Sequence, residues 1–227
     1  MVIPSMIIHT GPRVAEIWLM VFPRITGNLI CVKNRTIPRI IAIKLMLQRI
    51  FFQLMPAFAS ISDCPWVHIR IICTLRSTYT ALSVVAKELE AQGIETEIVA
   101  VGSRVVKGEL DAVVKEVGAK ITDADGLIVG SPVYYASPTG EILMFLDRLF
   151  GAYGNELRYK CGSSIASARR GGTTSTVDVL NKYFQINQMP VVSSNYWNIV
   201  HGNTPEEVVR DEEGMQTMRL LGKNMAW

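Results

Sequence analysis

The sequence predicts an α/β fold, in which a doubly wound parallel sheet lies between two layers of helices. Residues 124–150 show this most clearly, because they read as a buried strand, a tight loop and a helix in immediate succession. Within them, Leu127, Ile128 and Val129 form an apolar run without alternation, which is typical of a parallel strand covered on both faces. Five strand–helix units follow one another from Trp66 to the end of the chain, and such a series predicts a five-stranded sheet.

The first two units occupy residues 67–121. Residues 67–73 are apolar and β-branched and are predicted as the first strand. The helix after it ends at Gly93, a natural C-terminal glycine, and has one apolar face made by Leu82, Val85, Ala86 and Leu89. Residues 94–102 alternate and predict the second strand, and residues 109–121 predict a helix with a weaker apolar face.

The remaining units follow the same order. The third strand is predicted at 126–130, ended by Gly130, Ser131 and Pro132, and the helix at 140–150 repeats apolar residues at helical spacing. Residues 162–168 and 190–194 predict the fourth and fifth strands, with a helix at 174–188 between them. A last helix is predicted at 204–227, with Thr204 as its N-cap and Pro205 in its first position.

Residues 1–65 differ from residues 66–227, so we expect two parts. The first part has seven basic and two acidic residues, a net charge of +5, whereas the remainder has 16 basic and 18 acidic residues, a net charge of −2. A nearly neutral body argues against nucleic acid as a partner. The four cysteines, Cys31, Cys64, Cys73 and Cys161, lack metal-ligand spacing and predict reduced thiols in a cytoplasmic protein without a bound metal.

The apolar segment 40–62 raises the question of a membrane span. Lys44 and Arg49 interrupt it, and the uncharged run 50–62 is shorter than the roughly 20 residues that a spanning helix needs. We therefore expect no membrane role. An export signal ending near 57–59, an amphipathic helix packed on the domain, and non-native upstream sequence stay open as interpretations.

Three loops that follow strands carry residues suited to ligand binding, because open α/β sheets bind ligands at the carboxyl ends of their strands. The first loop enters a helix whose N–H groups, together with nearby hydroxyls and a guanidinium, suit a phosphate, and its candidate residues are Arg76, Ser77, Thr78 and Thr80. The second, 131–140, presents two tyrosines suited to a flat aromatic ligand. The third, 167–174, combines glycines with Arg169 and Arg170.

The chain from Ser77 onward resembles the NAD(P)H-dependent FMN reductases of the flavodoxin-like superfamily, including relatives of iron–sulfur flavoproteins. The resemblance is carried by GLIVGSPVYYASPTGEILMFLDR at 126–148, by residues 167–202 and by the closing GKNMAW. It implies a five-stranded sheet in the order 2-1-3-4-5 in a three-layer αβα arrangement. It also implies FMN at the strand ends, NAD(P)H as co-substrate, and assembly as a homodimer or homotetramer.

The resemblance also assigns cofactor-binding residues. The isoalloxazine ring would be bordered by Ser131, Pro132, Val133, Tyr134 and Tyr135, and its pyrimidine side by Ser167, Ala168, Arg169 and Gly171. Arg169 or Arg170 would stabilise the negative charge of the reduced flavin. No residue is predicted as a catalytic acid or base, since the cofactor performs the chemistry. His201 is a candidate proton donor, although a loop histidine is more often simply solvated.

Two departures from the family pattern matter. The first loop is shorter than the family's Gly-Ser-Pro-Arg to Asn-Thr segment, and only Arg76 and Thr78 match it plainly, which predicts weaker binding of the phosphate. Residues 109–121 contain no cysteine, so we expect no iron–sulfur cluster of the kind found in the relatives.

We therefore expect an FMN-dependent oxidoreductase that passes electrons from NAD(P)H to a quinone, a flavin, a nitroaromatic compound or another small acceptor. The alternative is a degenerate flavodoxin-like scaffold that binds FMN poorly and serves as a non-catalytic binding protein. A one-electron carrier is a third hypothesis, which the near-neutral charge of residues 66–227 disfavours because flavodoxins are typically acidic.

Overall fold

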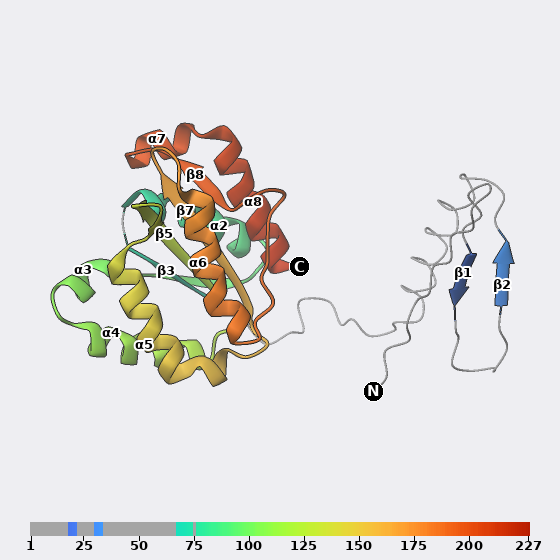
Figure 1. Cartoon of the computed structure of the whole chain (residues 1–227), viewed down its shortest axis with the longest axis horizontal. Helices are drawn as coiled ribbons and strands as arrows, with labels where there is room; N and C mark the ends of the chain where they lie inside the picture. Colours follow the sequence, from blue (N-terminus) through green and yellow to red (C-terminus); the bar gives the residue numbers. More distant parts are fainter. Residues whose placement is uncertain (1–17, 22–29, 34–66, 75) are drawn as a thin grey trace. The chain divides into compact units, whose positions relative to one another are not determined.

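The computed structural model describes residues 18–21, 30–33, 67–74 and 76–227 (Figure 1). The chain divides into two compact units, Met1–Cys64 and Pro65–Trp227. In the first unit, β1 (Trp18–Val21) and β2 (Ile30–Lys33) pair antiparallel. The segment 40–62, with its possible membrane or packing roles, lies outside the described residues. Among the residues that are described, no helix is both long and apolar enough to cross a membrane.

The second unit is built on a parallel sheet in the order β4-β3-β5-β7-β8, which confirms the predicted order 2-1-3-4-5. Its strands are β3 (His68–Cys73), β4 (Glu95–Ala100), β5 (Gly126–Tyr134), β7 (Cys161–Ala168) and β8 (Ile199–His201). β5 lies at the centre, so its residues Gly126 to Gly130 are all buried, as the unalternating apolar run predicts. A short strand, β6 (Ser137–Pro138), turns back and pairs antiparallel with the end of β5.

Helices cover both faces of this sheet, which gives the three-layer arrangement (Figure 1). One face is covered by α3 (Gly102–Val106), α4 (Leu110–Thr122), α5 (Gly140–Leu157) and α6 (Thr173–Ile186). The other face is covered by α2 (Arg76–Glu90), α7 (Pro205–Arg210) and α8 (Glu212–Ala226). The fold is therefore the flavodoxin-like arrangement that the sequence predicts.

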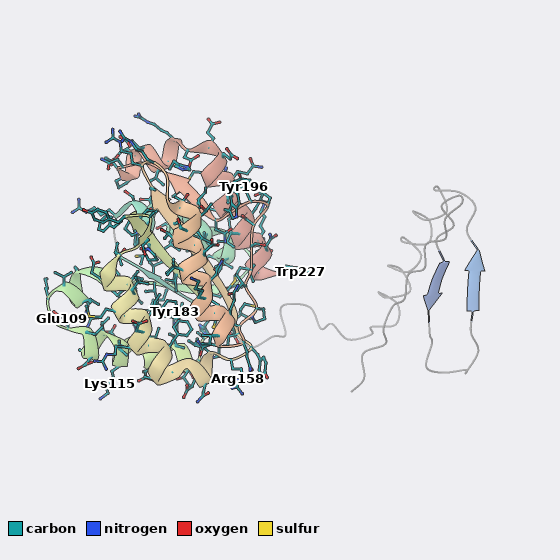
Figure 2. The ribbon with its side chains drawn as sticks, in the orientation of Figure 1. Glu109, Lys115, Arg158, Tyr183, Tyr196 and Trp227 are labelled. Atoms are coloured by element: carbon teal, nitrogen blue, oxygen red, sulfur yellow. The ribbon has the colours of Figure 1, made fainter. Side chains whose placement is uncertain are left out.

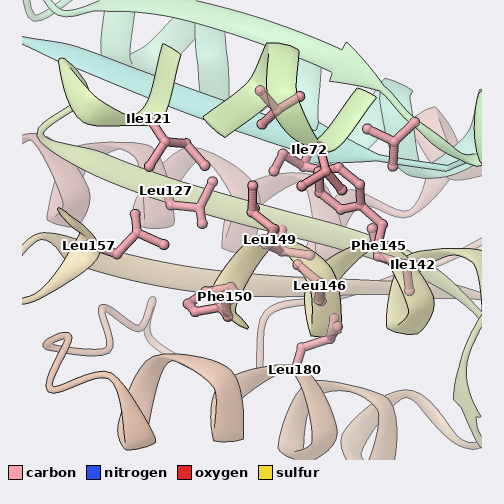
Figure 3. Close-up of a cluster of buried hydrophobic side chains, with 14 of the residues drawn as sticks. Ile72, Ile121, Leu127, Ile142, Phe145, Leu146, Leu149, Phe150, Leu157 and Leu180 are labelled. Atoms are coloured by element: carbon pink, nitrogen blue, oxygen red, sulfur yellow. The ribbon is translucent and has the colours of Figure 1, made fainter. Parts of the chain in front are cut away.

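The two faces of the sheet carry separate hydrophobic cores. Successive residues of a strand point to opposite faces, so Ile71 packs under α2 and α8 while Ile72 packs under α3 to α5. Figure 3 shows the second of these cores, in which Phe145 and Leu149 of α5 pack over the sheet together with Leu127 of β5. These side chains are fully buried, and burying each contributes about 1.5–3 kcal/mol.

The predicted third strand was too short. The structure continues β5 through Gly130, Ser131 and Pro132, because these residues pair in parallel with β7. The strand then runs on to Tyr134, because its last two residues pair antiparallel with β6. Pro132 is tolerated within β5 because it lies near the strand's end and beside the hairpin. The helix after it, α5, also extends beyond the predicted 140–150, to Leu157.

The predicted fifth strand at 190–194 was wrong. Residue Val191 makes only an isolated bridge to Gly162, and the chain then leaves the sheet until β8 begins at Ile199. The reason is Asn198, a buried side chain whose amide donates to Ser163 Oγ (3.2 Å) and to the carbonyl of Ser164 (3.1 Å). Its Oδ1 accepts from the hydroxyl of Ser194 (2.8 Å), so the segment 193–198 is held as a fixed loop.

The predicted helix at 204–227 is divided in two. Thr204 caps α7 by accepting a hydrogen bond from the N–H of Glu207 (3.3 Å), as predicted for this N-cap. At Asp211 the backbone leaves the helical conformation, and the Asp211 carboxylate accepts from the N–H of Gly214 (2.9 Å). An aspartate that caps a new helix therefore ends α7 and starts α8.

Candidate functional site

The carboxyl ends of β3, β5 and β7 lie side by side at one edge of the sheet, because these strands are neighbours and parallel. The three predicted loops leave from this edge. It is also the edge at which open α/β sheets bind ligands. We describe each loop in turn and then the contacts that join them.

The first loop is very short: β3 ends at Cys73 and α2 begins at Arg76. The first N–H groups of a helix have no acceptor within the helix and carry its positive partial charge, so the start of α2 suits an anion. Arg76 is exposed and Ser77 is half-buried at this start. Thr74, which sequence analysis missed, is 8% exposed, and its hydroxyl has no hydrogen-bond partner within the described part of the chain.

Close packing fixes the position of Thr74. A Cβ on Gly102, at the start of α3, would lie 3.0 Å from the Cβ and 3.1 Å from the carbonyl oxygen of Thr74, so only glycine fits comfortably there. An unpartnered buried hydroxyl costs free energy unless a bound group completes it. The signal that could have identified Thr74 is a hydroxyl placed directly after a strand and before a helix.

Thr78 joins the first loop to the third. Its hydroxyl and the hydroxyl of Ser167, at the end of β7, are 2.7 Å apart and both side chains are buried. The methyl group of Thr78 also packs over Gly130 of β5, where a Cβ would lie only 2.6 Å from it. The predicted residues Thr78 and Ser167 are therefore brought together, and their hydroxyls bond to each other.

The second loop is a hairpin stabilised by a buried serine side chain. Ser131 is buried; its hydroxyl donates to the carbonyl of Pro132 (2.8 Å) and accepts from the N–H of Thr139 (3.1 Å). The side chain of Ser131 thus fixes the two ends of the hairpin, and Pro132 is buried beside it. The other three residues predicted to border the ring are accessible: Val133 is partly buried, and Tyr134 and Tyr135 are exposed.

The tip of the hairpin presents aromatic side chains on a tight turn. Tyr134 pairs with Ser137, and the two residues between them, Tyr135 and Ala136, both have a left-handed backbone with φ of 52° and 57°. Such a turn matches the twist of a hairpin but usually contains Asn or Gly. Left-handed backbone costs an ordinary residue about 1–3 kcal/mol, and such strain clusters at functional sites. Tyr135 is fully exposed.

The third loop packs against this tip. Gly172 precedes α6 with φ of 98°, and a Cβ there would lie 2.8 Å from both the Cα of Ala136 and the Cγ1 of Val133. Sequence analysis missed this role of Gly172. Ala168 is buried, whereas Arg169, Arg170 and Gly171 are exposed at the edge. The three loops therefore form one connected rim.

One predicted residue does not belong to this rim by its side chain. The hydroxyl of Thr80 donates to the carbonyl of Arg76 within α2 (3.1 Å), and Thr80 lines a groove between α2 and α8 on the outer face of the helices. The same groove is lined by Lys87 and Arg219. Thr80 was predicted from its position in the sequence after the first strand. Because it lies within α2, its side chain lines the groove instead of the rim.

The cysteine nearest the rim is suited to a structural role. Cys73 ends β3 and is buried, and this burial raises the pKa of its thiol to about 11, so the thiol stays protonated at neutral pH. A protonated, buried thiol is a poor nucleophile and a poor metal ligand. The described residues contain no group of three or more side chains that could hold a metal ion.

Comparison with known proteins agrees with this geometry. Residues 70–204 match the family model described as NADPH-dependent FMN reductase. An iron–sulfur flavoprotein of Methanocaldococcus jannaschii is 33% identical over 168 residues, which is 64% of this chain and 84% of that protein. An iron–sulfur flavoprotein of Methanosarcina thermophila is 30% identical over 121 residues, covering 51% of this chain and 62% of that protein.

Solved structures show the same fold. A flavodoxin, WrbA-like protein from Agrobacterium tumefaciens superposes with a TM-score of 0.56 at 17% identity, over 71% of this chain and 96% of that one. An NADH:FMN oxidoreductase, EmoB, in its apo form superposes with a TM-score of 0.56 at 19% identity, over 70% and 88% of the two chains. The fold and the rim define a flavodoxin-like protein. The chain belongs to the NADPH-dependent FMN reductase family.

Proposed function

We propose that the rim at the carboxyl edge binds FMN and that the protein passes electrons from NAD(P)H, through the bound flavin, to a small acceptor such as a quinone or a free flavin. The observation that carries this proposal is the convergence of the start of α2, the aromatic hairpin and the 167–172 loop at one edge of the sheet. Membership of the family supports it.

The residues at the rim fit such a cofactor. The start of α2 offers unpaired N–H groups and the orphan hydroxyl of Thr74, which suit a phosphate. The hairpin offers Tyr134 and Tyr135, which suit a flat ring, and Arg169 offers positive charge. Bound FMN accepts hydride and donates electrons by itself, so the protein's part is to hold and orient it.

Each loop would have a distinct task in that complex. The start of α2, with Arg76, Ser77 and Thr74, would hold the phosphate. Val133, Tyr134 and Tyr135 would flank the ring, and Ala168, Arg169 and Gly171 would lie along its pyrimidine side. The buried residues Ser131, Thr78 and Ser167 would fix these loops rather than touch the ring with their side chains.

The proposal also covers the location, the assembly and the partners of the protein. We place it in the cytoplasm, as a homodimer or homotetramer, with small molecules rather than nucleic acid as its partners. We also propose that it carries no iron–sulfur cluster, because residues 101–125, between the second and third strands, contain no cysteine.

A second candidate function follows from the two-residue connection between β3 and α2. So short a connection offers few donors to a phosphate, and each lost charge-assisted hydrogen bond weakens binding by about 1.5–3 kcal/mol. In this alternative the protein is a flavodoxin-like scaffold that binds FMN poorly and acts as a binding protein.

Flavin binding distinguishes the two. Purified full-length protein is mixed with FMN and desalted, and its visible absorption spectrum is recorded before and after anaerobic addition of NADPH or NADH. A retained flavin band that bleaches with either nicotinamide supports the reductase and leads to acceptor screening. Protein that leaves the column without flavin supports the scaffold.

A further inference from the structure

The third loop of the rim enters α6, and the start of this helix has no side-chain cap among the described residues. Gly172 occupies the N-cap position with a left-handed φ of 98° and offers no side chain to the first N–H groups. The helices α7 and α8 differ, because Thr204 and Asp211 accept hydrogen bonds from their first turns. The start of α6 therefore combines uncapped N–H groups with the partial positive charge of a 14-residue helix.

One hydroxyl of the first turn of α6 is free. Those of Ser175 and Thr176 turn back to the carbonyl of Gly172, at 3.4 Å and 2.9 Å. Thr173, the first residue of the helix, is only 5% exposed, and its hydroxyl has no hydrogen-bond partner in the described part of the chain. Unlike the enclosed orphan hydroxyl of Thr74, its oxygen touches solvent, so it remains open to a ligand. A buried side chain with a free, accessible hydroxyl at a helix start indicates a polar ligand there.

Contacts place this helix start beside the aromatic hairpin. A Cβ on Gly172 would lie 2.8 Å from the Cα of Ala136 and from the Cγ1 of Val133, so the two segments touch. A Cβ on the preceding residue, Gly171, would have nothing within 4 Å, so the backbone there borders open space. The start of α6 is therefore adjacent to the hairpin proposed to flank the flavin ring, and a second ligand can reach it.

Two arginines add positive charge to this helix start. Arg169 and Arg170 follow β7 directly, are exposed, and form no ion pair within the described residues. Asp178, the first acidic residue after them in the chain, is exposed further along α6. An anion at the start of α6 would thus meet uncapped N–H groups, a free hydroxyl and two guanidinium groups.

This anion would belong to a second molecule. The proposed flavin cofactor has a single phosphate, which the start of α2 is proposed to hold. The helices α2 and α6 follow different strands, β3 and β7, and cover opposite faces of the sheet, so one phosphate cannot occupy both helix starts. A nicotinamide dinucleotide carries a diphosphate and, in NADPH, a further 2′-phosphate, and its ring must come close to the flavin.

We propose that the start of α6, with Arg170 and Thr173, binds a phosphate group of the nicotinamide co-substrate. This inference rests on the proposed function and adds a second anion site to it. The nicotinamide ring would lie beside the hairpin, with its phosphates at the third loop. Arg170 is the residue to test, because Arg169 and Gly171 are already proposed to lie along the flavin ring.

The test is the anaerobic reduction of FMN-loaded, full-length protein by NADPH, by NADH and by reduced nicotinamide riboside, which has no phosphate. Stopped-flow saturation curves give the dissociation constant of each donor separately from the limiting rate. The variants are Arg170→Gln and Thr173→Val. Their matched controls are Arg158→Gln, at an exposed arginine just after α5 and at the other edge of the sheet, and Thr174→Val, at the next residue of α6.

We expect Arg170→Gln to weaken the binding of NADPH about three- to tenfold with an unchanged limiting rate, and Thr173→Val to weaken it about two- to fivefold. A loss shared by NADH assigns the site to the diphosphate, and a loss confined to NADPH assigns it to the 2′-phosphate. The binding of the riboside should not change, and both controls should behave as wild type.

The reduction potential of the bound flavin distinguishes this role from stabilisation of the reduced ring. We expect the potential in Arg170→Gln to stay at the wild-type value. Unchanged nucleotide binding in Arg170→Gln, an equal loss for the riboside or in Arg158→Gln, or a lowered potential overturns the inference while the proposed function stands. Wild-type protein that takes up no FMN, or whose flavin neither nucleotide reduces, overturns both.

Discussion

The hydrogen bond between Thr78 and Ser167 is the residue-scale contact on which the rim depends, because it is buried and joins two loops far apart in sequence. In Thr78→Val the shape is kept but the hydroxyl of Ser167 loses its partner. We expect the free energy of unfolding to fall by about 1–3 kcal/mol. Urea unfolding followed by circular dichroism measures this loss.

Thr80→Val is the matched control for Thr78→Val, since the Thr80 hydroxyl bonds only to a carbonyl of its own helix and is not buried. We expect a change within about 0.5 kcal/mol. Equal losses in the two variants would show that the contact with Ser167 contributes nothing particular.

Gly172 is the second residue on which the rim depends. In Gly172→Ala the new Cβ would lie 2.8 Å from Ala136 and Val133 and the backbone would keep a left-handed φ of 98°. The hairpin must shift, so we expect a loss of about 1–3 kcal/mol in stability together with weaker FMN binding. Chemical unfolding and a flavin titration measure the two effects.

Gly171→Ala provides the comparison for Gly172→Ala, because the neighbouring glycine is exposed and a Cβ there would meet nothing within 4 Å. We expect it to leave the stability within about 0.5 kcal/mol of wild type. If Gly172→Ala is equally harmless, then the third loop does not brace the hairpin.

At the scale of elements, the 193–198 loop replaces a strand. Tyr196 and Trp197 stack edge to face on it, with ring centroids 4.8 Å apart, and both are about half exposed. Figure 2 labels Tyr196 at the surface of this unit. The loop is also tied to α8, because the amide of Asn224 donates to the carbonyl of Ser193 (2.8 Å). Its conformation therefore depends on polar contacts rather than on pairing in the sheet.

Asn198→Ala should release this loop. The change removes a buried amide that bonds to Ser163, Ser164 and Ser194, so we expect a loss of about 2–3 kcal/mol in the free energy of unfolding. The fluorescence of Trp197 should also move toward that of a solvated indole. Asn195→Ala, at an exposed position of the same loop, is the control. A stable Asn198→Ala protein with native fluorescence contradicts this account.

At the scale of the whole molecule, every element of the parallel sheet and of the rim lies in Pro65–Trp227, which has its own core on each face of the sheet. We therefore expect a protein of residues 65–227 to unfold cooperatively and to bind FMN within about twofold of the full chain. Thermal unfolding and a flavin titration on both proteins test this. A shortened protein that fails to fold would show that residues 1–64 are needed.

Most of the strands and helices could be predicted because apolar periodicity and turn residues act locally, whereas the strand order was implied by the resemblance to the flavodoxin-like family. Leu127, Ile128 and Val129 are buried on both faces, and Gly93 has a positive φ of 80° after α2, as their patterns indicate. The prediction of the fifth strand at 190–194 was wrong because PVVSS has the composition of a strand. A buried residue further along the chain, Asn198, determines where pairing with the sheet occurs. No local pattern contains that information.

The rim could be predicted only in part, for the same reason. The sequence places Thr78, Ser131 and Ser167 in the correct loops, but it does not show that their hydroxyls bond to protein partners. The roles of Thr74 and Gly172 come from close packing against α3 and the hairpin, which are contacts between distant segments. Tertiary packing thus determines which residues of a loop remain free to touch a ligand.

The hairpin is stabilised by backbone pairing of β5 with β6 and by the buried hydroxyl of Ser131, not by the side chains at its tip. Positions 134 and 135 can therefore be diversified without rebuilding the scaffold. The left-handed backbone at 135 favours Asn, Asp or Gly in such a library. Under the proposed function, we expect selection among such tip variants to change the preference for the electron acceptor.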